Sequence, residues 1–159
     1  KNIKTIIIGS TWKYKKLFDG TKYIEDPNFL IYGKSLLNLA NSIKKKGKKV
    51  YIIGPIQNPF YNLPSELARK VKFGIINKQD VLQELSIERS IYDREFLKVK
   101  NLLKNNMKEN LIDPSLRQCD NKYCYLGNEN GIFFADLDHL SYYGSQFFSD
   151  IFIKVFLNS

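Results

Sequence analysis

The sequence predicts an α/β protein in which helices cover both faces of a parallel β-sheet. Short apolar, β-branched runs alternate with longer segments whose apolar residues recur every three to four positions. This alternation of strand and helix favours parallel strands joined by helical crossovers. No repeat, low-complexity tract or linker interrupts the 159 residues. We therefore expect a single domain over residues 1–159, which is long enough to bury a substantial core.

Three strands are expected, and glycine or proline follows each of them. They are residues 3–8 before Gly9, residues 49–53 before Gly54, and residues 111–113 before Pro114. In open α/β sheets, functional sites are built at the carboxyl ends of the strands. We therefore expect Gly9, Gly54 and the loop at His139 to lie at one functional edge.

Four helices are expected, and each has a boundary signal or an apolar stripe. They are residues 32–46, residues 64–73, residues 87–105 and a last helix capped by Ser141. The last helix carries a stripe of apolar and aromatic residues, which is typical of a core-facing side. Residues 13–29, with turn signals at Asp19-Gly20 and Asp26-Pro27, are interpreted as an irregular loop.

The chain is basic, with 25 Lys and Arg against 16 Asp and Glu and a net charge of +9. Such a charge favours an acidic partner, such as nucleic acid, an anionic glycan or a membrane surface. Much of the excess lies in residues 44–49, which we interpret as a solvated turn. The longest apolar runs are far shorter than the roughly 20 residues that cross a bilayer. We therefore expect no membrane helix here, and we expect this to be a piece of a longer chain because it opens with Lys1 on a strand.

Two cysteines, Cys119 and Cys124, lie five positions apart. In an exported protein they would form a small-loop disulfide, whereas in the cytosol they would be free thiols or half of a metal site.

His139 is the only histidine, so a mechanism that needs an imidazole base must use it. Asp136 and Asp138 lie beside it in sequence and offer the ring a carboxylate partner. An Asp and a His in contact are two thirds of a catalytic triad. The alternatives are a surface loop without function and a metal site made of these three residues.

Four stretches in order resemble one family. Residues 135–141, followed by Gly144, resemble the Asp-x-x-His block of SGNH hydrolases, in the form carried by the extracytoplasmic domain of membrane acyltransferase-3 proteins. The other three are residues 4–12 with Tyr14, residues 47–55 with Leu63-Pro64 and Arg69, and residues 112–114 with Cys119-Asp120 and Cys124.

This resemblance implies a flavodoxin-like SGNH three-layer sandwich with a parallel sheet that lacks its first strand in this chain. It implies Asp136 and His139 as the acid and base of the triad, Gly9 as a backbone oxyanion donor, and a Cys119–Cys124 disulfide. The family's nucleophile lies in a Gly-Asp-Ser block, which this sequence does not contain. Ser10 follows a strand and a glycine, but it lacks the flanks of a nucleophile elbow.

The resemblance further implies transfer of an acyl group, preferably acetyl, to a hydroxyl of a bacterial surface polysaccharide. A membrane acyltransferase domain would deliver the donor, and the missing N-terminal segment of the domain would supply the serine, so that this chain alone is inactive. No cofactor, no metal and no nucleic-acid partner is expected. The site would face the periplasm or the cell exterior. The alternatives are an esterase that removes O-acetyl groups and a non-catalytic, basic glycan-binding module.

Overall fold

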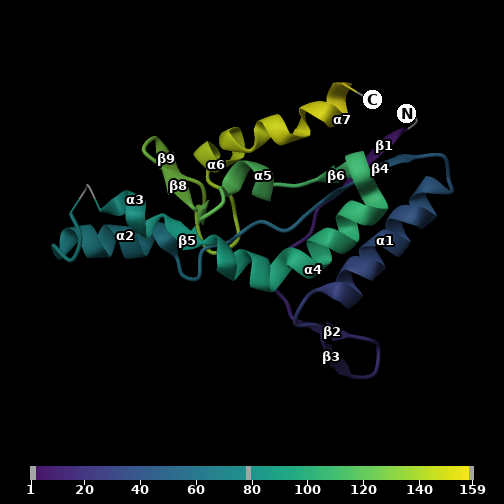
Figure 1. The fold of residues 1–159 in the computed structure, drawn as a ribbon, viewed down its shortest axis with the longest axis horizontal. Coiled ribbons are helices and arrows are strands. Elements are labelled where there is room, and N and C mark those ends of the chain that lie inside the picture. The colour runs from purple at the N-terminus through teal and green to yellow at the C-terminus, as the bar shows by residue number, and fades with distance from the viewer. Residues whose placement is uncertain (1–2, 78–79, 158–159) are drawn as a thin grey trace. The chain divides into compact units, whose positions relative to one another are not determined.

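The computed structural model describes residues 3–77 and 80–157 (Figure 1). Contacts divide the chain into two compact units. The first comprises Lys1–Pro55, Asp93–Pro114 and Phe152–Ser159, and the second comprises Ile56–Tyr92 and Ser115–Ile151. No helix among the described residues is both long enough and apolar enough to cross a membrane.

The first unit contains the predicted parallel sheet. Strands β1 (Thr5–Ile8), β4 (Lys49–Ile53) and β6 (Leu111–Ile112) pair in parallel in the order β1-β4-β6. The centre of the middle strand is buried, because Val50, Tyr51 and Ile52 all lie in the core. Gly9 and Gly54 follow β1 and β4 directly, so both lie at the carboxyl edge of this sheet.

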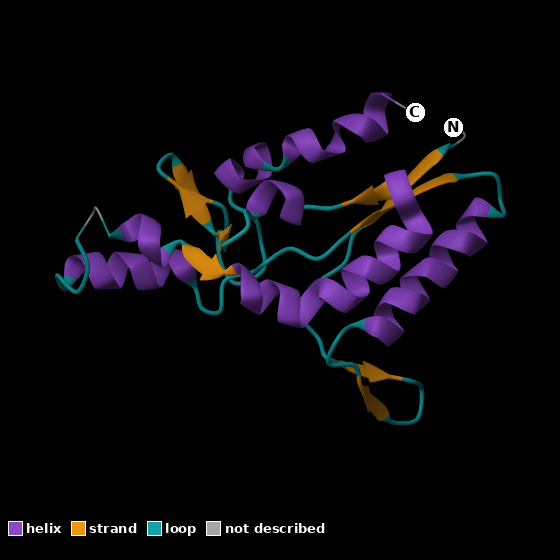
Figure 2. Cartoon of the chain, viewed as in Figure 1, coloured by secondary structure: helices purple, strands orange, loops and turns teal. Residues whose placement is uncertain are grey.

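Helices of the first unit flank the sheet. In the view of Figure 2 the strands run between α7 (Ile153–Leu157) on one side and α1 (Leu30–Lys44) with α4 (Arg89–Met107) on the other. Helices α1 and α4 approach closely at Gly33, where an added Cβ would lie 2.6 Å from Val99 Cγ2. The expected fold class is therefore confirmed: a mixed α/β structure with a parallel sheet.

Residues 13–29 are not the irregular loop that was expected. Strands β2 (Lys16–Phe18) and β3 (Tyr23–Glu25) form an antiparallel hairpin. The sequence predicts the turn at Asp19-Gly20. It does not predict the two strands, because three residues each are too few to show the alternation of apolar and polar residues that is typical of a strand. Asp19 stabilises the turn, because its Oδ1 accepts hydrogen bonds from the backbone N–H groups of Thr21 and Lys22 at 2.8 and 2.9 Å.

The second unit combines short strands with short helices. Strand β5 (Ser86–Glu88) pairs with β7 (Tyr123–Tyr125), and β8 (Gly127–Asn128) pairs with β9 (Gly131–Ile132), both antiparallel. The helices are α2 (Leu63–Lys72), α3 (Val81–Glu84), α5 (Ser115–Gln118) and α6 (Tyr142–Phe147). The core of the second unit consists of aliphatic and aromatic side chains: Leu63, Leu67, Leu85, Ile87, Leu126, Phe133, Phe134 and Phe148.

Two helix predictions need correction. The third helix begins at Arg89 rather than Ile87, because Ile87 pairs with Cys124 in the β5–β7 ladder. The last helix is interrupted: α6 ends at Phe147, and a 3₁₀ turn over Ser149–Phe152 precedes α7. Ser149 Oγ donates to the carbonyl of Gln146 at 2.8 Å at this point, a local bond that competes with regular helix.

Candidate active site

The loop that carries His139 belongs to the second unit and is closed by backbone hydrogen bonds. The N–H of Ala135 donates to the carbonyl of His139 at 2.8 Å, and Phe134 and Leu140 form an antiparallel bridge. Phe133 and Phe134 are almost fully buried, so the loop starts from the core. Residues 135–139 therefore form a short turn that is held at both ends by hydrogen bonds and by the buried residues before it.

Helix α6 follows the loop and fixes its second end. Ser141 is the N-cap, as predicted, and its Oγ accepts a hydrogen bond from Gly144 N–H at 2.9 Å. The same hydroxyl donates to the carbonyl of Ile132 at 2.6 Å. Only glycine fits at position 144, because an added Cβ would lie 1.9 Å from the carbonyl oxygen of Phe133. The helix start is therefore packed directly on the strand that leads into the loop.

Asp136 organises the loop with both carboxylate oxygens. Its Oδ1 accepts from the backbone N–H groups of Asp138 and His139, each at 2.8 Å. Its Oδ2 lies 2.8 Å from Nδ1 of the His139 ring. The two carboxylates beside His139 therefore differ in role: Asp136, rather than Asp138, contacts the imidazole nitrogen.

These contacts shift both ionisation equilibria. The backbone N–H bonds from Asp138 and His139, with the imidazole as a further partner, lower the pKa of Asp136 to about 2. The hydrogen bond and negative charge of Asp136 raise the pKa of His139 above its ordinary value of 6.5. Asp136 is thus ionised at neutral pH and favours a proton on Nδ1, which leaves Nε2 of the neutral ring as an acceptor.

The imidazole is open to solvent, with 80% of its side chain exposed. Within residues 3–77 and 80–157, Nε2 has no hydrogen-bond partner. A neutral ring in this state can take a proton from a hydroxyl group brought to Nε2, which is the task of a general base.

The other predicted site residues belong to the first unit. Gly9 follows β1, and its N–H remains the predicted oxyanion donor. The hydroxyl of Ser10 is hydrogen-bonded to the hydroxyl of Tyr32, a partner that cannot act as a strong base at neutral pH. No group of three His, Cys, Asp or Glu side chains in the described part of the chain is arranged to hold a metal ion.

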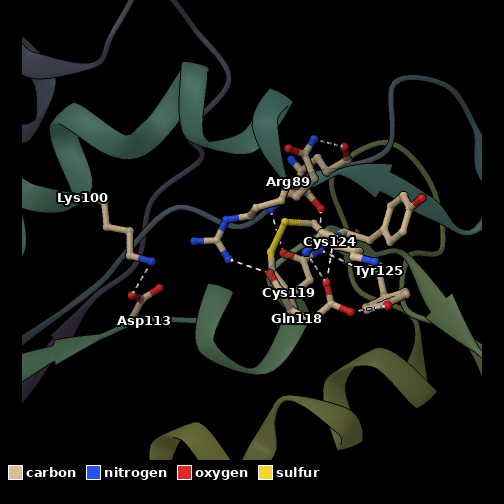
Figure 3. Close-up of a disulfide and its surroundings, with 12 residues drawn as sticks. Arg89, Lys100, Asp113, Gln118, Cys119, Cys124 and Tyr125 are labelled. Carbon is tan, nitrogen blue, oxygen red and sulfur yellow. Dashed lines mark hydrogen bonds and ion pairs between the residues drawn. A yellow bond between two sulfur atoms is a disulfide. The ribbon is translucent and has the colours of Figure 1, made fainter.

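Cys119 and Cys124 form the predicted disulfide (Figure 3). It closes a turn in which Asp120 accepts hydrogen bonds from the N–H groups of Lys122 and Tyr123 and from the Tyr125 hydroxyl, the last at 2.6 Å. Arg89 donates to the carbonyl of Asp120 at 3.3 Å. This turn is therefore tied to β7 and to the start of α4 by polar contacts as well as by the sulfur bridge.

Gln118 supports the same region and was not singled out by sequence reasoning. It is completely buried, and its amide bridges the N–H and the carbonyl of Gln57 at 2.8 and 2.7 Å. It also donates to the carbonyl of Tyr125 at 3.1 Å. A glutamine next to a cysteine carries no sequence signal for such a role, because glutamine is usually exposed.

Comparison with known proteins agrees with this architecture. Residues 1–154 match the family model described as the SGNH domain fused to AT3 domains. Among solved structures, the chain is similar to the periplasmic domain of the lipopolysaccharide acetyltransferase of Salmonella ser. Paratyphi A, with a TM-score of 0.64 and 18% sequence identity. The similarity covers 97% of this chain and 57% of that chain, so this chain spans a little over half of that structure. No curated protein sequence matches the chain.

Proposed function

We propose, since this chain belongs to the family of SGNH domains fused to AT3 domains, that it takes part in acyl transfer to a bacterial cell-surface polysaccharide. The observation that carries the proposal is the 2.8 Å contact between Asp136 Oδ2 and His139 Nδ1 on a solvent-exposed loop. The similarity to a domain of a lipopolysaccharide acetyltransferase supports acetyl as the acyl group and a glycan hydroxyl as the acceptor.

In the proposed mechanism His139 moves one proton in each half-reaction. Nε2 takes the proton of a serine hydroxyl as the serine oxygen attacks the acyl carbonyl, and it returns that proton to the leaving group. It then takes the proton of the sugar hydroxyl that attacks the acyl-serine, and returns it to the serine oxygen. Asp136 keeps Nδ1 protonated and stabilises the imidazolium, while the Gly9 N–H is assigned to the oxyanion.

The serine is proposed to come from a further segment of the same domain, on a strand that pairs with β1. Strand β1 is at the edge of the sheet order β1-β4-β6, so one side of its backbone is open to pairing within the described residues. Its Ile7 is 39% exposed, although it lies in a β-branched run. An added strand would cover this edge, which otherwise invites unspecific pairing. On this view residues 1–159 are part of one SGNH-like domain and are inactive alone.

The site is proposed to face the periplasm or the cell exterior, attached to a membrane acyltransferase domain that supplies the acyl donor. The disulfide supports this location, because such bonds persist in oxidising compartments. The family description, which names fusion to AT3 domains, supports the membrane partner.

The proposal is tested by exchanging His139→Ala in the full-length gene product and measuring ester-linked acyl groups on the surface polysaccharide by NMR. Acylation should fall by at least about a thousandfold, because the general base is lost. Asp138→Asn is the matched control, since it removes the neighbouring carboxylate without touching the contact to Nδ1, and it should retain activity within a few-fold.

Two results would overturn the proposal. Unchanged acylation in a folded His139→Ala protein would exclude His139 as the base. A rise in acylation in that variant would instead indicate an esterase, because loss of a deacylating enzyme leaves more acyl groups on the polysaccharide.

A further inference from the structure

A hollow of about 320 Å³ lies in the first unit, beyond the carboxyl end of β1. Aromatic side chains line most of it: Tyr14, Phe18, Tyr23 and Tyr32. Thr11 and Lys16 add a hydroxyl and an ammonium group. Its volume is at the lower end of the range of about 300–1,000 Å³ that is usual for small-molecule sites.

The aromatic side chains of this hollow are unusually exposed. Tyr14, Phe18 and Tyr23 are 68%, 61% and 73% exposed. The rings of Phe18 and Tyr23 face each other across the hairpin, with centroids 5.4 Å apart. Three large aromatic residues gathered on one exposed surface usually mark a binding site, whereas single ones need no explanation.

The hairpin holds these rings in place. Lys16 and Glu25, paired in register, form an ion pair of 3.1 Å beside them, and the Asp19 turn closes the other end. Leu17 and Ile24, paired in register between these residues, are half-buried, and Leu17 adds an aliphatic side chain to the lining of the hollow. A surface that is arranged before a ligand arrives loses little conformational entropy on binding.

The floor of the hollow is tied to the sheet. Tyr32 is a residue of α1, and its backbone N–H donates a hydrogen bond to Asp26 Oδ2 at 2.9 Å. Trp12 packs against the Tyr32 ring at 5.4 Å, and its indole N–H donates to the carbonyl of Ile53, the last residue of β4, at 3.4 Å. The hollow therefore lies at the strand ends where open α/β sheets bind ligands.

We infer that this hollow binds a pyranose ring of the acceptor polysaccharide; the identity of the ligand rests on the proposed function. A pyranose has a flat face of C–H groups, which packs on exposed aromatic rings, and a rim of hydroxyls. Three of the four rings are tyrosines, so their hydroxyl groups, with Thr11 and Lys16, offer hydrogen-bond partners to that rim.

The same observations disfavour a membrane or a nucleic acid as the occupant. A bilayer would favour unpaired cations around an apolar surface, but Lys16 is paired with Glu25. Binding to a phosphate backbone depends on several Lys and Arg side chains, whereas Lys16 is the only one that lines the hollow among the described residues.

The test measures binding of the full-length gene product to the surface polysaccharide of its own organism, immobilised after mild base has removed its ester-linked acyl groups. Phe18→Ala and Tyr23→Ala should each weaken binding roughly tenfold or more, as expected for aromatic anchors. Tyr14→Ala, outside the hairpin strands, should do the same without altering the hairpin. Phe73→Ala is the matched control, because Phe73 is equally exposed at 67% but belongs to the second unit.

Binding does not require catalysis, so His139→Ala should bind as the wild type does. If His139→Ala loses acyl transfer but still binds the polysaccharide, both proposals are supported. If His139→Ala keeps acyl transfer while Phe18→Ala and Tyr23→Ala weaken binding, only the proposed mechanism is overturned. Absence of polysaccharide binding, or equal weakening by Phe73→Ala, would overturn the hollow as a glycan site. Binding to anionic phospholipid vesicles that depends on Phe18 and Tyr23, without polysaccharide binding, would also overturn it.

Discussion

At the scale of single residues, one carboxylate both shapes the loop and raises the pKa of the imidazole. Asp136 accepts two backbone hydrogen bonds through one oxygen and contacts His139 through the other. The spacing in the sequence leaves Asp136 and Asp138 both open as partners of His139, and the family resemblance implies Asp136. In the structure Asp136 makes this contact, and the backbone N–H of Asp138 donates to the same carboxylate.

The titration of His139 is the first prediction. Because this is the only histidine, its imidazole gives one resolvable NMR signal, whose midpoint should lie above pH 6.5. Asp136→Asn should return the midpoint toward 6.5, because it removes the negative charge. Acyl transfer, which needs the neutral ring, should rise with pH through the same midpoint. An unchanged midpoint in Asp136→Asn would contradict the coupling.

The same shifts predict how stability depends on pH. The raised pKa of His139 adds stability that is complete below about pH 6.5 and is lost as pH rises through the folded-state pKa. The lowered pKa of Asp136 adds stability that is present above about pH 3.8 and is lost as pH falls toward 2. The urea concentration at the midpoint of unfolding should therefore be highest between about pH 3.8 and 6.5 and should decrease on either side of this window. The decrease should be smaller in Asp136→Asn.

Gly144 gives a prediction about packing. Gly144→Ala should destabilise the protein by about 3 kcal/mol, because the new Cβ would overlap the backbone of Phe133 and helix α6 must move. Gly9→Ala is the control for stability, since the nearest atom to its added Cβ is 3.5 Å away. Urea unfolding measures both, and equal midpoints for the two variants would contradict the contact.

At the scale of elements, long periodic segments were predictable and short ones were not. Strand β4 and helices α1 and α2 were expected within two residues of their observed bounds. Hairpin β2–β3, helix α3 and strand β5 were missed, since three or four residues cannot show a period. Strand β5, for example, is formed through pairing with β7, which is distant in sequence.

The disulfide turn gives the prediction at this scale. Replacing Cys119 and Cys124 by serine should cost about 2 kcal/mol, the chain-entropy value for so short a loop. The loss should be modest because hydrogen bonds to Asp120 still close the turn. Asp120→Ala in the double serine variant should therefore add a further loss, measured by urea unfolding; no additional loss would show that the sulfur bridge alone holds the turn.

At the scale of the whole molecule, the α/β class was predictable from the alternation of strand and helix patterns, and the family was predictable because four motifs occur in order along the sequence. What could not be predicted is the division into two compact units, since it depends on which contacts are dense in three dimensions. That residues 1–159 form part of a single domain stays a prediction. The catalytic roles of Gly9, Asp136 and His139 also stay predictions; the 2.8 Å contact between Asp136 and His139 supports the roles of these two residues.

The most direct test is a double-mutant cycle on acyl transfer by the full-length gene product, using Asp136→Asn, His139→Ala and the double variant. If both residues act as one unit, each single variant should lose at least about a thousandfold, and the double variant should lose no more than His139→Ala alone. Losses that multiply in the double variant, or an Asp136→Asn protein with wild-type rates, would contradict the Asp136–His139 mechanism.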